Sequence, residues 1–215
     1  MVQKSEPGHW HCLSQGTFQN LDFEDATIVP DTSSFYYPYV VYASDAIPGW
    51  TAYVGGSQVS EILYNDEFLS GGAVSIIGTS YSRPSIQGNY SIILGGFNYP
   101  GFLRTAGIGQ TGQVPGNALS LIFWGNIGAN DVSFDGQTLS LTVLGSTANY
   151  NIYGADISRF EGQTGQLLFT TVPGGHDMID NIQFSSSEIP EPSIVGLSAL
   201  SGLLLAWRRW KAHTI

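Results

Sequence analysis

The clearest hairpin pattern in the chain is Val132-Ser133-Phe134-Asp135-Gly136-Gln137-Thr138-Leu139. Two short runs rich in strand-forming residues flank an Asp-Gly pair, which is a preferred two-residue connection between antiparallel strands. The stretch therefore predicts a β-hairpin with its turn at Asp135-Gly136, and it places the chain among the β proteins.

The same alternation of strands and turns runs outward from this hairpin in both directions. Glycine-rich pairs mark the turns, and β-rich runs lie between them. No segment of useful length has helical periodicity, although one short helix is expected at residues 155–160. This organisation predicts a single all-β domain, a two-sheet β-sandwich, over residues 18–187. The predicted strands are 40–44, 50–54, 60–64, 73–77, 90–94, 120–124, 139–144, 150–153, 165–170 and 179–184.

The composition agrees with this class of fold and excludes others. Charged residues make up 11% of the 215 residues and glycine occurs 27 times, whereas long helices are rich in Ala, Glu, Lys and Leu. Residues 1–187 contain four basic and fifteen acidic side chains, a net charge of −11. A body this acidic repels phosphate backbones, so we expect no nucleic-acid partner. Because Cys12 is the single cysteine, no disulfide can form within the chain.

Residues 1–17 are predicted to be a disordered N-terminal stub. His9, His11 and Cys12 lie close together, but without a second ligand cluster they make a poor zinc site. Residues 1–20 contain no apolar core of a secretory signal. We interpret this as a start assigned downstream of the true one, the alternative being a truncated copy.

Residues 188–215 form a segment of different character. Pro190-Glu191-Pro192 interrupts regular structure, and an uncharged apolar run follows over residues 193–207. About 15 helical residues span roughly 22 Å, against about 30 Å of membrane hydrocarbon, so this run would be a short anchor. The alternative is a C-terminal helix of the globular domain. The predicted interfacial and stop-transfer residues are Trp207, Arg208, Arg209 and Lys211.

The order of these three parts resembles the PEP-CTERM sorting signal of Gram-negative bacteria. The resemblance implies a precursor held in the inner membrane by its apolar helix, with the β domain outside the cytoplasm. It further implies that an exosortase recognises Pro190, Glu191 and Pro192 and cleaves nearby. The mature protein would then reach the cell surface or an exopolysaccharide matrix.

Four motifs in the β domain resemble those of the galactose-binding-like jelly rolls, a family that includes many carbohydrate-binding modules. Residues 20–24 (NLDFE) are similar to the opening strand, and Pro48-Gly49-Trp50 is similar to a turn whose tryptophan enters the sandwich. Residues 87–91 (QGNYS) are similar to an internal segment, and residues 180–184 (DNIQF) to the closing strand. The resemblance implies that the sandwich is of the jelly-roll type.

The same resemblance implies one cofactor, a structural calcium ion. In that family the opening Glu and the closing Asp often lie close together and help to hold Ca²⁺; here these residues are Glu24 and Asp180. Calcium prefers several oxygen ligands, which carbonyl groups of the intervening loops can supply. The alternative is that both carboxylates accept hydrogen bonds from backbone N–H groups.

The sequence contains no recognisable set of catalytic residues. His176, the one histidine of the predicted β domain, follows a Gly-Gly pair that is typical of an exposed turn, and no G-x-S-x-G motif accompanies it. Asp66 with Glu67, or Asp22 with Glu24, would be the candidate pairs for glycoside hydrolysis. Adjacent acids in a turn are usually solvated, so we predict that the protein is not an enzyme.

Aromatic residues are dense in residues 35–42. Tyr36, Tyr37 and Tyr39 are the predicted ligand contacts, because sugar rings stack their C–H faces on aromatic side chains. The alternative is that these tyrosines fill the core and brace a long loop.

These observations lead to one functional expectation with two alternatives. We expect an exported, non-enzymatic surface or matrix protein that binds exopolysaccharide or is embedded in it. The alternatives are a carbohydrate-active hydrolase and a purely structural matrix protein without a discrete ligand.

Overall fold

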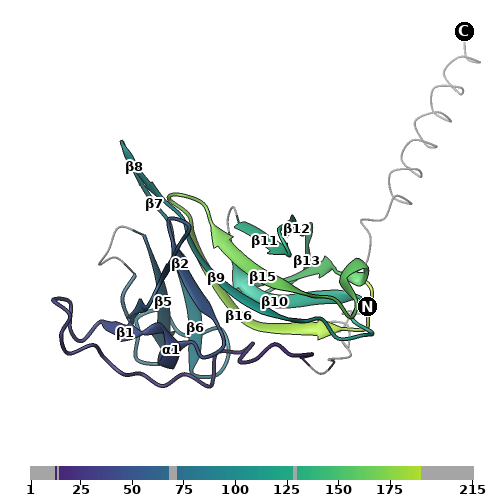
Figure 1. Ribbon diagram of the computed structural model, residues 1–215, viewed down its shortest axis with the longest axis horizontal. Helices are drawn as coiled ribbons and strands as arrows, with labels where there is room; N and C mark the ends of the chain where they lie inside the picture. The colour runs from purple at the N-terminus through teal and green to yellow at the C-terminus, as the bar shows by residue number, and fades with distance from the viewer. Residues whose placement is uncertain (1–12, 14, 68–71, 128–129, 190–215) are drawn as a thin grey trace, which may run out of the picture.

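The computed structural model describes residues 13, 15–67, 72–127 and 130–189. Within these ranges the chain forms an eight-stranded sheet, a six-stranded sheet and a separate two-stranded hairpin (Figure 1). A short helix α1 (Ala43–Ala46) and a 3₁₀ helix η1 (Ser158–Phe160) accompany them. The strands are β1 (Val40–Tyr42), β2 (Thr51–Val54), β3 (Ser57–Val59), β4 (Glu61–Tyr64), β5 (Ala73–Gly78), β6 (Tyr90–Gly95), β7 (Phe97–Tyr99), β8 (Phe102–Arg104), β9 (Ala106–Gln113), β10 (Ser120–Asn126), β11 (Asn130–Phe134), β12 (Gln137–Thr138), β13 (Leu141–Ser146), β14 (Asn151–Asp156), β15 (Thr164–Thr171) and β16 (His176–Ser185).

The two large sheets form the predicted β-sandwich. The eight-stranded sheet has the order β1-β4-β5-β6-β16-β10-β14-β13, and the six-stranded sheet has the order β12-β11-β15-β9-β2-β3. Strands β4 and β5 pair in parallel. The hairpin predicted from the Asp-Gly pair is also confirmed, since β11 and β12 pair with Phe134 opposite Gln137.

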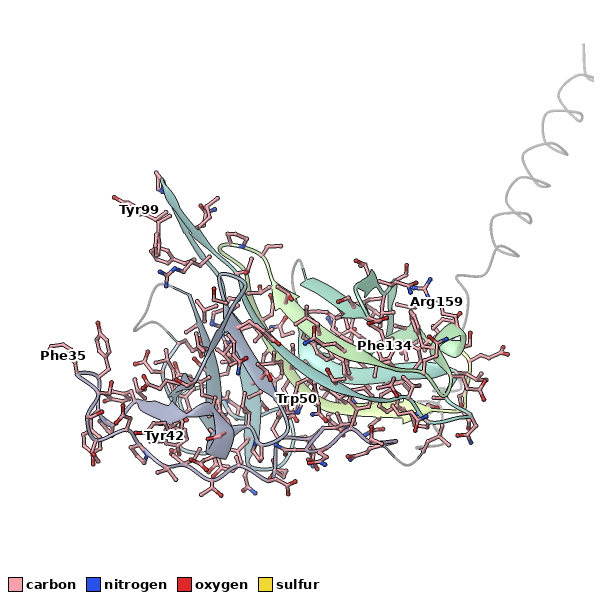
Figure 2. The ribbon with its side chains drawn as sticks, viewed as in Figure 1. Phe35, Tyr42, Trp50, Tyr99, Phe134 and Arg159 are labelled. Atoms are coloured by element: carbon pink, nitrogen blue, oxygen red, sulfur yellow. The ribbon has the colours of Figure 1, made fainter. Side chains whose placement is uncertain are left out.

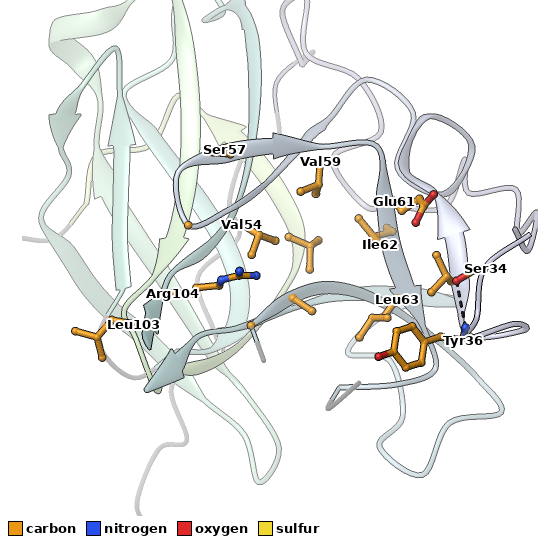
Figure 3. A pocket seen from close by; sticks show the side chains of 15 residues that line it. Ser34, Tyr36, Val54, Ser57, Val59, Glu61, Ile62, Leu63, Leu103 and Arg104 are labelled. Carbon is orange, nitrogen blue, oxygen red and sulfur yellow. Dashed lines mark hydrogen bonds between the residues drawn. The ribbon is translucent and has the colours of Figure 1, made fainter. Parts of the chain in front are cut away.

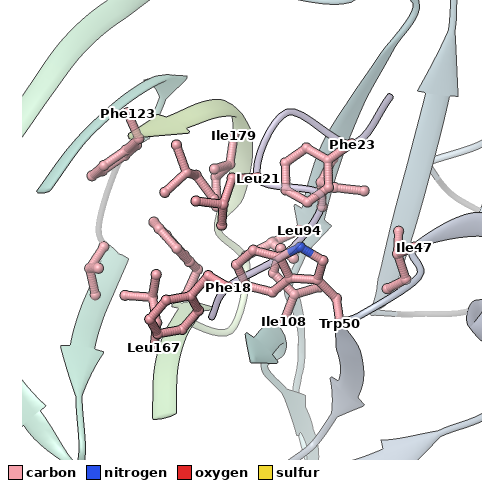
Figure 4. Packing of buried hydrophobic residues seen from close by; sticks show 14 of the residues in the cluster. Phe18, Leu21, Phe23, Ile47, Trp50, Leu94, Ile108, Phe123, Leu167 and Ile179 are labelled. Atoms are coloured by element: carbon pink, nitrogen blue, oxygen red, sulfur yellow. The ribbon is translucent and has the colours of Figure 1, made fainter. Parts of the chain in front are cut away.

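One hydrophobic core lies between the two sheets, and Trp50 is at its centre (Figure 4). Its ring centroid lies 5.6 Å from that of Phe23 and 6.3 Å from that of Phe169. Its indole Nε1 donates a hydrogen bond to the Asn20 carbonyl at 3.0 Å, so the polar end of this buried ring is satisfied. The expectation that this tryptophan enters the sandwich is confirmed.

Residues 20–24, which resemble an opening strand, form turns instead. Asn20 and Phe23 have positive φ angles of 48° and 59°, a backbone geometry that β-strands do not adopt. Leu21 and Phe23 are nevertheless fully buried, and the Leu21 carbonyl accepts a hydrogen bond from the Ile182 N–H at 2.9 Å. The segment therefore lies beside β16 without joining a sheet.

Strand β9 is the largest element that the sequence pattern missed. It lies between β15 and β2 in the six-stranded sheet, although its sequence, AGIGQTGQ, is rich in glycine, which strands usually avoid. A Cβ atom at Gly107 would lie 2.8 Å from the Phe169 carbonyl oxygen, and one at Gly112 would lie 2.9 Å from the Phe18 ring. Because these atoms pack so closely against the strand, there is no room for a side chain at either position, and glycine is required there.

Two shorter predictions need correction. The strand expected at 40–44 ends at Tyr42, before α1 begins at Ala43, and the helix expected at 155–160 is strand up to Asp156 and a 3₁₀ helix over Ser158–Phe160. Part of the predicted N-terminal stub belongs to the fold, because the Leu13 N–H donates to the Phe184 carbonyl at 3.0 Å. The cluster of His9, His11 and Cys12 lies outside the described residues.

The C-terminal end of the described chain folds back onto the eight-stranded sheet. The Ser120 hydroxyl donates to the Ser187 carbonyl at 2.7 Å, and the Ile189 side chain contacts Gly154, where an added Cβ would overlap it. In the part of the chain that the structure describes, no helix is long and apolar enough to cross a membrane. The sorting motif Pro190, Glu191 and Pro192 and the residues Trp207, Arg208, Arg209 and Lys211 lie outside that part.

Candidate functional site

The tyrosine-rich loop is organised around Asp31. Its Oδ1 atom accepts hydrogen bonds from the Ser33 N–H at 2.8 Å, the Ser33 hydroxyl at 2.7 Å and the Tyr42 hydroxyl at 3.1 Å. The hydrogen bonds from Ser33 lower the pKa of Asp31. Further along, the Tyr39 N–H donates to the Tyr36 carbonyl at 2.9 Å and the Tyr64 N–H to the Tyr39 carbonyl at 2.8 Å. These hydrogen bonds give the loop a defined conformation and attach it to β4.

The tyrosines of this loop face solvent and do not fill the core. Tyr36 is 44% exposed, Tyr37 is 55% and Tyr39 is 45%, and Phe35 beside them is 94% exposed. Phe35 and Tyr36 contact each other edge to face, with ring centroids 5.3 Å apart. The alternative that these residues pack in the core is wrong, while their role as ligand contacts stays a prediction.

A cavity of about 640 Å³ opens beside this loop (Figure 3). It lies where the β1-β4-β5 edge of the eight-stranded sheet faces β2 and β3 at the edge of the other sheet, and β8 borders it as well. Val54, Val59 and Ile62 are among its apolar lining residues. Tyr36 also lines it, whereas Tyr37 and Tyr39 are not among the lining residues. Of the three predicted ligand contacts, the structure places Tyr36 at the cavity and the other two away from it.

The β7–β8 hairpin forms a second protrusion at this end of the molecule (Figure 2, where Phe35 and Tyr99 mark the two). Tyr99 and Leu103 are both 64% exposed. Phe97 packs against Phe102 with ring centroids 5.6 Å apart. The sequence analysis missed this hairpin, although Pro100-Gly101 at its tip is a recognisable turn pair.

Two charged side chains of opposite sign line the cavity. Arg104 reaches into it from the hairpin, and Glu61 comes from the start of β4, at the end where Tyr36 lies (Figure 3). The Arg104 guanidinium carbon lies 4.3 Å from the centroid of the Phe102 ring, a cation–π geometry. The cavity therefore combines an apolar floor, one aromatic ring and two charges.

Glu24 and Asp180, the predicted calcium ligands, hold the same segment, residues 85–91, which leads into the start of β6. Glu24 Oε1 accepts hydrogen bonds from the backbone N–H groups of Asn89 and Tyr90, at 2.7 and 3.0 Å. Asp180 Oδ2 accepts one from the Gln87 N–H at 2.9 Å. The two carboxylates are thus brought to one place, as the resemblance implies.

Asp180 is buried. This burial is the main reason why its pKa is raised to about 7. The negative charge of Glu24 raises the pKa further, whereas hydrogen bonds from Ser91 and Gln87 oppose the rise. The Ser91 hydroxyl donates to Asp180 Oδ2 at 2.7 Å. Ionising this carboxyl group therefore costs free energy in the folded state.

The residues around these carboxylates do not fit a calcium ion well. The donors that face Glu24 and Asp180 are N–H and O–H groups, whereas calcium requires six to eight oxygen ligands. Among the described residues, no group of three or more His, Cys, Asp or Glu side chains is arranged to hold a metal. The hydrogen bonds observed are those of the alternative, in which N–H groups satisfy both carboxylates.

The Glu67 carboxylate contacts the His176 imidazole on another part of the eight-stranded sheet. The Glu67 side chain is 4% exposed. This acid is therefore buried, whereas an acid in a turn was expected to be solvated. Arg83 Nη1 lies 3.4 Å from His176 Nδ1. Because a guanidinium only donates, Nδ1 accepts this hydrogen bond and Nε2 carries the proton that faces Glu67. His176 is thus fixed by two charged neighbours at the start of β16.

No protein-family model matches this chain, and no curated protein matches it. Among solved structures, a family 61 carbohydrate-binding module in complex with β-1,4-galactotriose is 13% identical; the match covers 80% of this chain and 98% of that one, with a TM-score of 0.42. The enzymatically active domain of bacteriophage CBA120 tailspike protein 4 is 16% identical over 80% of this chain and 21% of its own, with a TM-score of 0.44.

A family 11 carbohydrate-binding module from Clostridium thermocellum, in complex with a β-1,3-1,4-mixed-linked tetrasaccharide, is 14% identical. That match covers 71% of this chain and 97% of the module, with a TM-score of 0.33. Carbohydrate-binding modules are therefore among the structural neighbours of this sandwich. What this chain itself binds has to be inferred from its own residues.

Proposed function

We propose that this protein is a non-enzymatic glycan-binding protein of the bacterial cell surface or extracellular matrix. The observation that supports the proposal is the cavity of about 640 Å³ between the sheet edges, beside a fixed loop of exposed tyrosines. Its volume falls within the range of about 300–1,000 Å³ that is usual for small-molecule sites, which leaves room for a short stretch of polysaccharide.

The chemistry of the loop suits sugar rings. Tyr36, Tyr37 and Tyr39 are between 44% and 55% exposed, and each offers an apolar ring face together with a hydroxyl group. Aromatic side chains supply large contact area with few rotatable bonds, so binding costs little side-chain entropy. None of the three belongs to the hydrophobic core cluster of the described residues.

Binding is better supported than hydrolysis. Glycoside hydrolysis by the common mechanisms uses two carboxyl groups on either side of the scissile bond. Among the described residues that line the cavity, Glu61 is the single carboxylate. Glu67, from the candidate pair Asp66 and Glu67, is paired with His176 and does not line this cavity.

Export and sorting form the second part of the proposal. The support is the resemblance of residues 188–215 to a PEP-CTERM signal, with an exosortase as processing partner, membrane attachment of the precursor and exopolysaccharide as the final surroundings. The direct test is to restore the upstream in-frame sequence and follow where the protein goes. A tail that stays uncleaved in a host with an exosortase would contradict this part.

Glycan binding is tested by depletion of the full-length chain from solution with a panel of insoluble polysaccharides. Each aromatic contact contributes about 0.5–1.5 kcal/mol, so replacing Tyr36, Tyr37 and Tyr39 by Ala should weaken retention about tenfold or more. Val143→Ala is the matched control, because Val143 is 54% exposed on β13, the opposite edge of the sheet. Equal retention of the triple variant would remove the tyrosines from the site; no retention of any protein would favour a purely structural matrix role.

A further inference from the structure

Arg104 is one of three arginines that the structure describes, and the one of them that lines the cavity. Arg83 forms an ion pair with Glu67, and Arg159 lies above the Phe160 ring and close enough to Asp156 to lower the pKa of that carboxyl. Arg104 forms no ion pair with any of the described residues. Its guanidinium carbon lies over the Phe102 ring.

The position of Arg104 is fixed by the surrounding backbone. Its side chain passes over two glycines, since a Cβ atom at Gly72 would lie 3.2 Å from Arg104 Cβ and one at Gly55 would lie 3.8 Å from Arg104 Cγ. With the Phe102 ring on one side, these contacts direct the guanidinium into the cavity (Figure 3). A group held in this way loses little conformational entropy when it binds a ligand.

Arg104 forms no ion pair with a carboxylate of the described residues, although the protein is acidic. Residues 1–187 carry fifteen acidic against four basic side chains, so partners for a guanidinium are abundant. Arg104 instead faces a cavity whose floor is apolar. A guanidinium offers five N–H donors in a planar fork that matches a carboxylate or a sulfate, and such pairs are stronger where water is partly excluded.

We propose that this cavity selects a glycan with an anionic sugar unit, whose carboxylate or sulfate group binds Arg104 while the C–H face of another unit of the same glycan contacts Tyr36. The inference rests on the proposed glycan binding and names the class of glycan. Glu61 lies at the other end of the cavity (Figure 3) and accepts hydrogen bonds from sugar hydroxyl groups. The two charges therefore fix the direction of the ligand, with its anionic group toward the hairpin.

Because Arg104 and Glu61 carry opposite charges, removing each charge should change the affinity for an anionic glycan in opposite directions. Arg104→Gln removes a charge-assisted pair and should weaken binding of an anionic glycan about tenfold to a hundredfold. Arg104→Lys keeps the charge without the planar fork and should retain part of the affinity. Glu61→Gln removes a like charge and should tighten the same complex. Arg159→Gln is the control, because Arg159 is not among the residues that line the cavity.

The experiment is affinity electrophoresis of the full-length chain and these variants through gels that contain polygalacturonate, neutral galactan or a sulfated galactan. We expect retardation by an anionic polymer, weakened by Arg104→Gln and by about 1 M salt, where the Debye length is about 3 Å. Polygalacturonate and sulfated galactan distinguish a carboxylate from a sulfate ligand. Thermal melting of each variant confirms that it is folded.

Two results would overturn the inference. Equal retardation by galactan and by both charged polymers, unchanged in Arg104→Gln, would leave the proposed glycan binding in place but remove charge selection. The absence of retardation by all three polymers would overturn the inference, and retention by the insoluble panel would then show whether glycan binding itself survives.

Discussion

Replacing Asp180 by Asn should change how the stability of the protein depends on pH. Asp180 is buried beneath residues 85–91, and its pKa is raised from 3.8 to about 7. A carboxyl group whose pKa is raised by folding binds its proton more tightly in the folded state. Its stabilising contribution is therefore complete below about pH 4 and is lost as the pH rises through about 7.

The magnitude follows from the size of the pKa shift. A difference of about 3 units, at about 1.4 kcal/mol per unit, sets an upper bound of about 4 kcal/mol between pH 4 and pH 8. Asparagine keeps an oxygen that can accept from Ser91 and Gln87, but it loses the hydrogen bond that Asp180 Oδ1 accepts from the Asn181 N–H. We therefore expect Asp180→Asn to be less stable than the parent by about 1 kcal/mol at pH 4, and more stable at pH 8.

The assay is urea unfolding of the parent and Asp180→Asn chains from pH 4 to pH 8, in EDTA so that no metal contributes. Because the other titrating groups are shared, the difference in unfolding free energy isolates Asp180, apart from its coupling to Glu24. Asp156→Asn is the control without a slope in this range: hydrogen bonds from Ser158 lower the pKa of Asp156, so its contribution is complete above about pH 4 and is lost only at lower pH. A difference between parent and Asp180→Asn that stays constant across this range would refute the reasoning.

Three further predictions concern metal binding, the core and the C-terminal segment. Adding EDTA or calcium should leave the melting temperature unchanged, because N–H groups already satisfy the carboxylates of Glu24 and Asp180. An increase of the melting temperature on adding calcium that is lost when Glu24 is replaced would contradict this. Trp50→Ala should lower the unfolding free energy by about 3–5 kcal/mol, measured by urea unfolding; a loss below about 1 kcal/mol would show that the core closes over the gap. Gly154→Val should displace Ile189 and speed proteolysis of residues 186–189, measured by timed digestion; digestion at the parent rate would mean that Ile189 is not held there.

Local patterns in the sequence were sufficient for the class of fold. The Asp-Gly pair between β11 and β12 and the β-rich runs that became β5, β6, β10 and β15 could be recognised because turn residues and strand periodicity act over a few residues. Pro48-Gly49-Trp50 belongs to the same group, since it combines a turn with a large residue that has to be buried. The acidic charge of the body is likewise a property of composition alone.

Other features arise only when distant segments meet. Strand β9 has poor strand propensity, and it forms because Phe18 and the Phe169 backbone close over its glycines. The tyrosines of the loop are exposed because Asp31 and β4 hold the loop outside the core, which no pattern of tyrosines can express.

The candidate site belongs to this second group. Arg104 looks like an ordinary strand-end residue in the sequence, yet Gly55 and Gly72, which both precede it in the chain, direct it into the same cavity as Tyr36 and Glu61. The β-sandwich and the net negative charge could be predicted from the amino-acid sequence, because strand, turn and charge preferences are local. The tertiary structure alone decided which side chains share a cavity, because that depends on which sheet edges face each other.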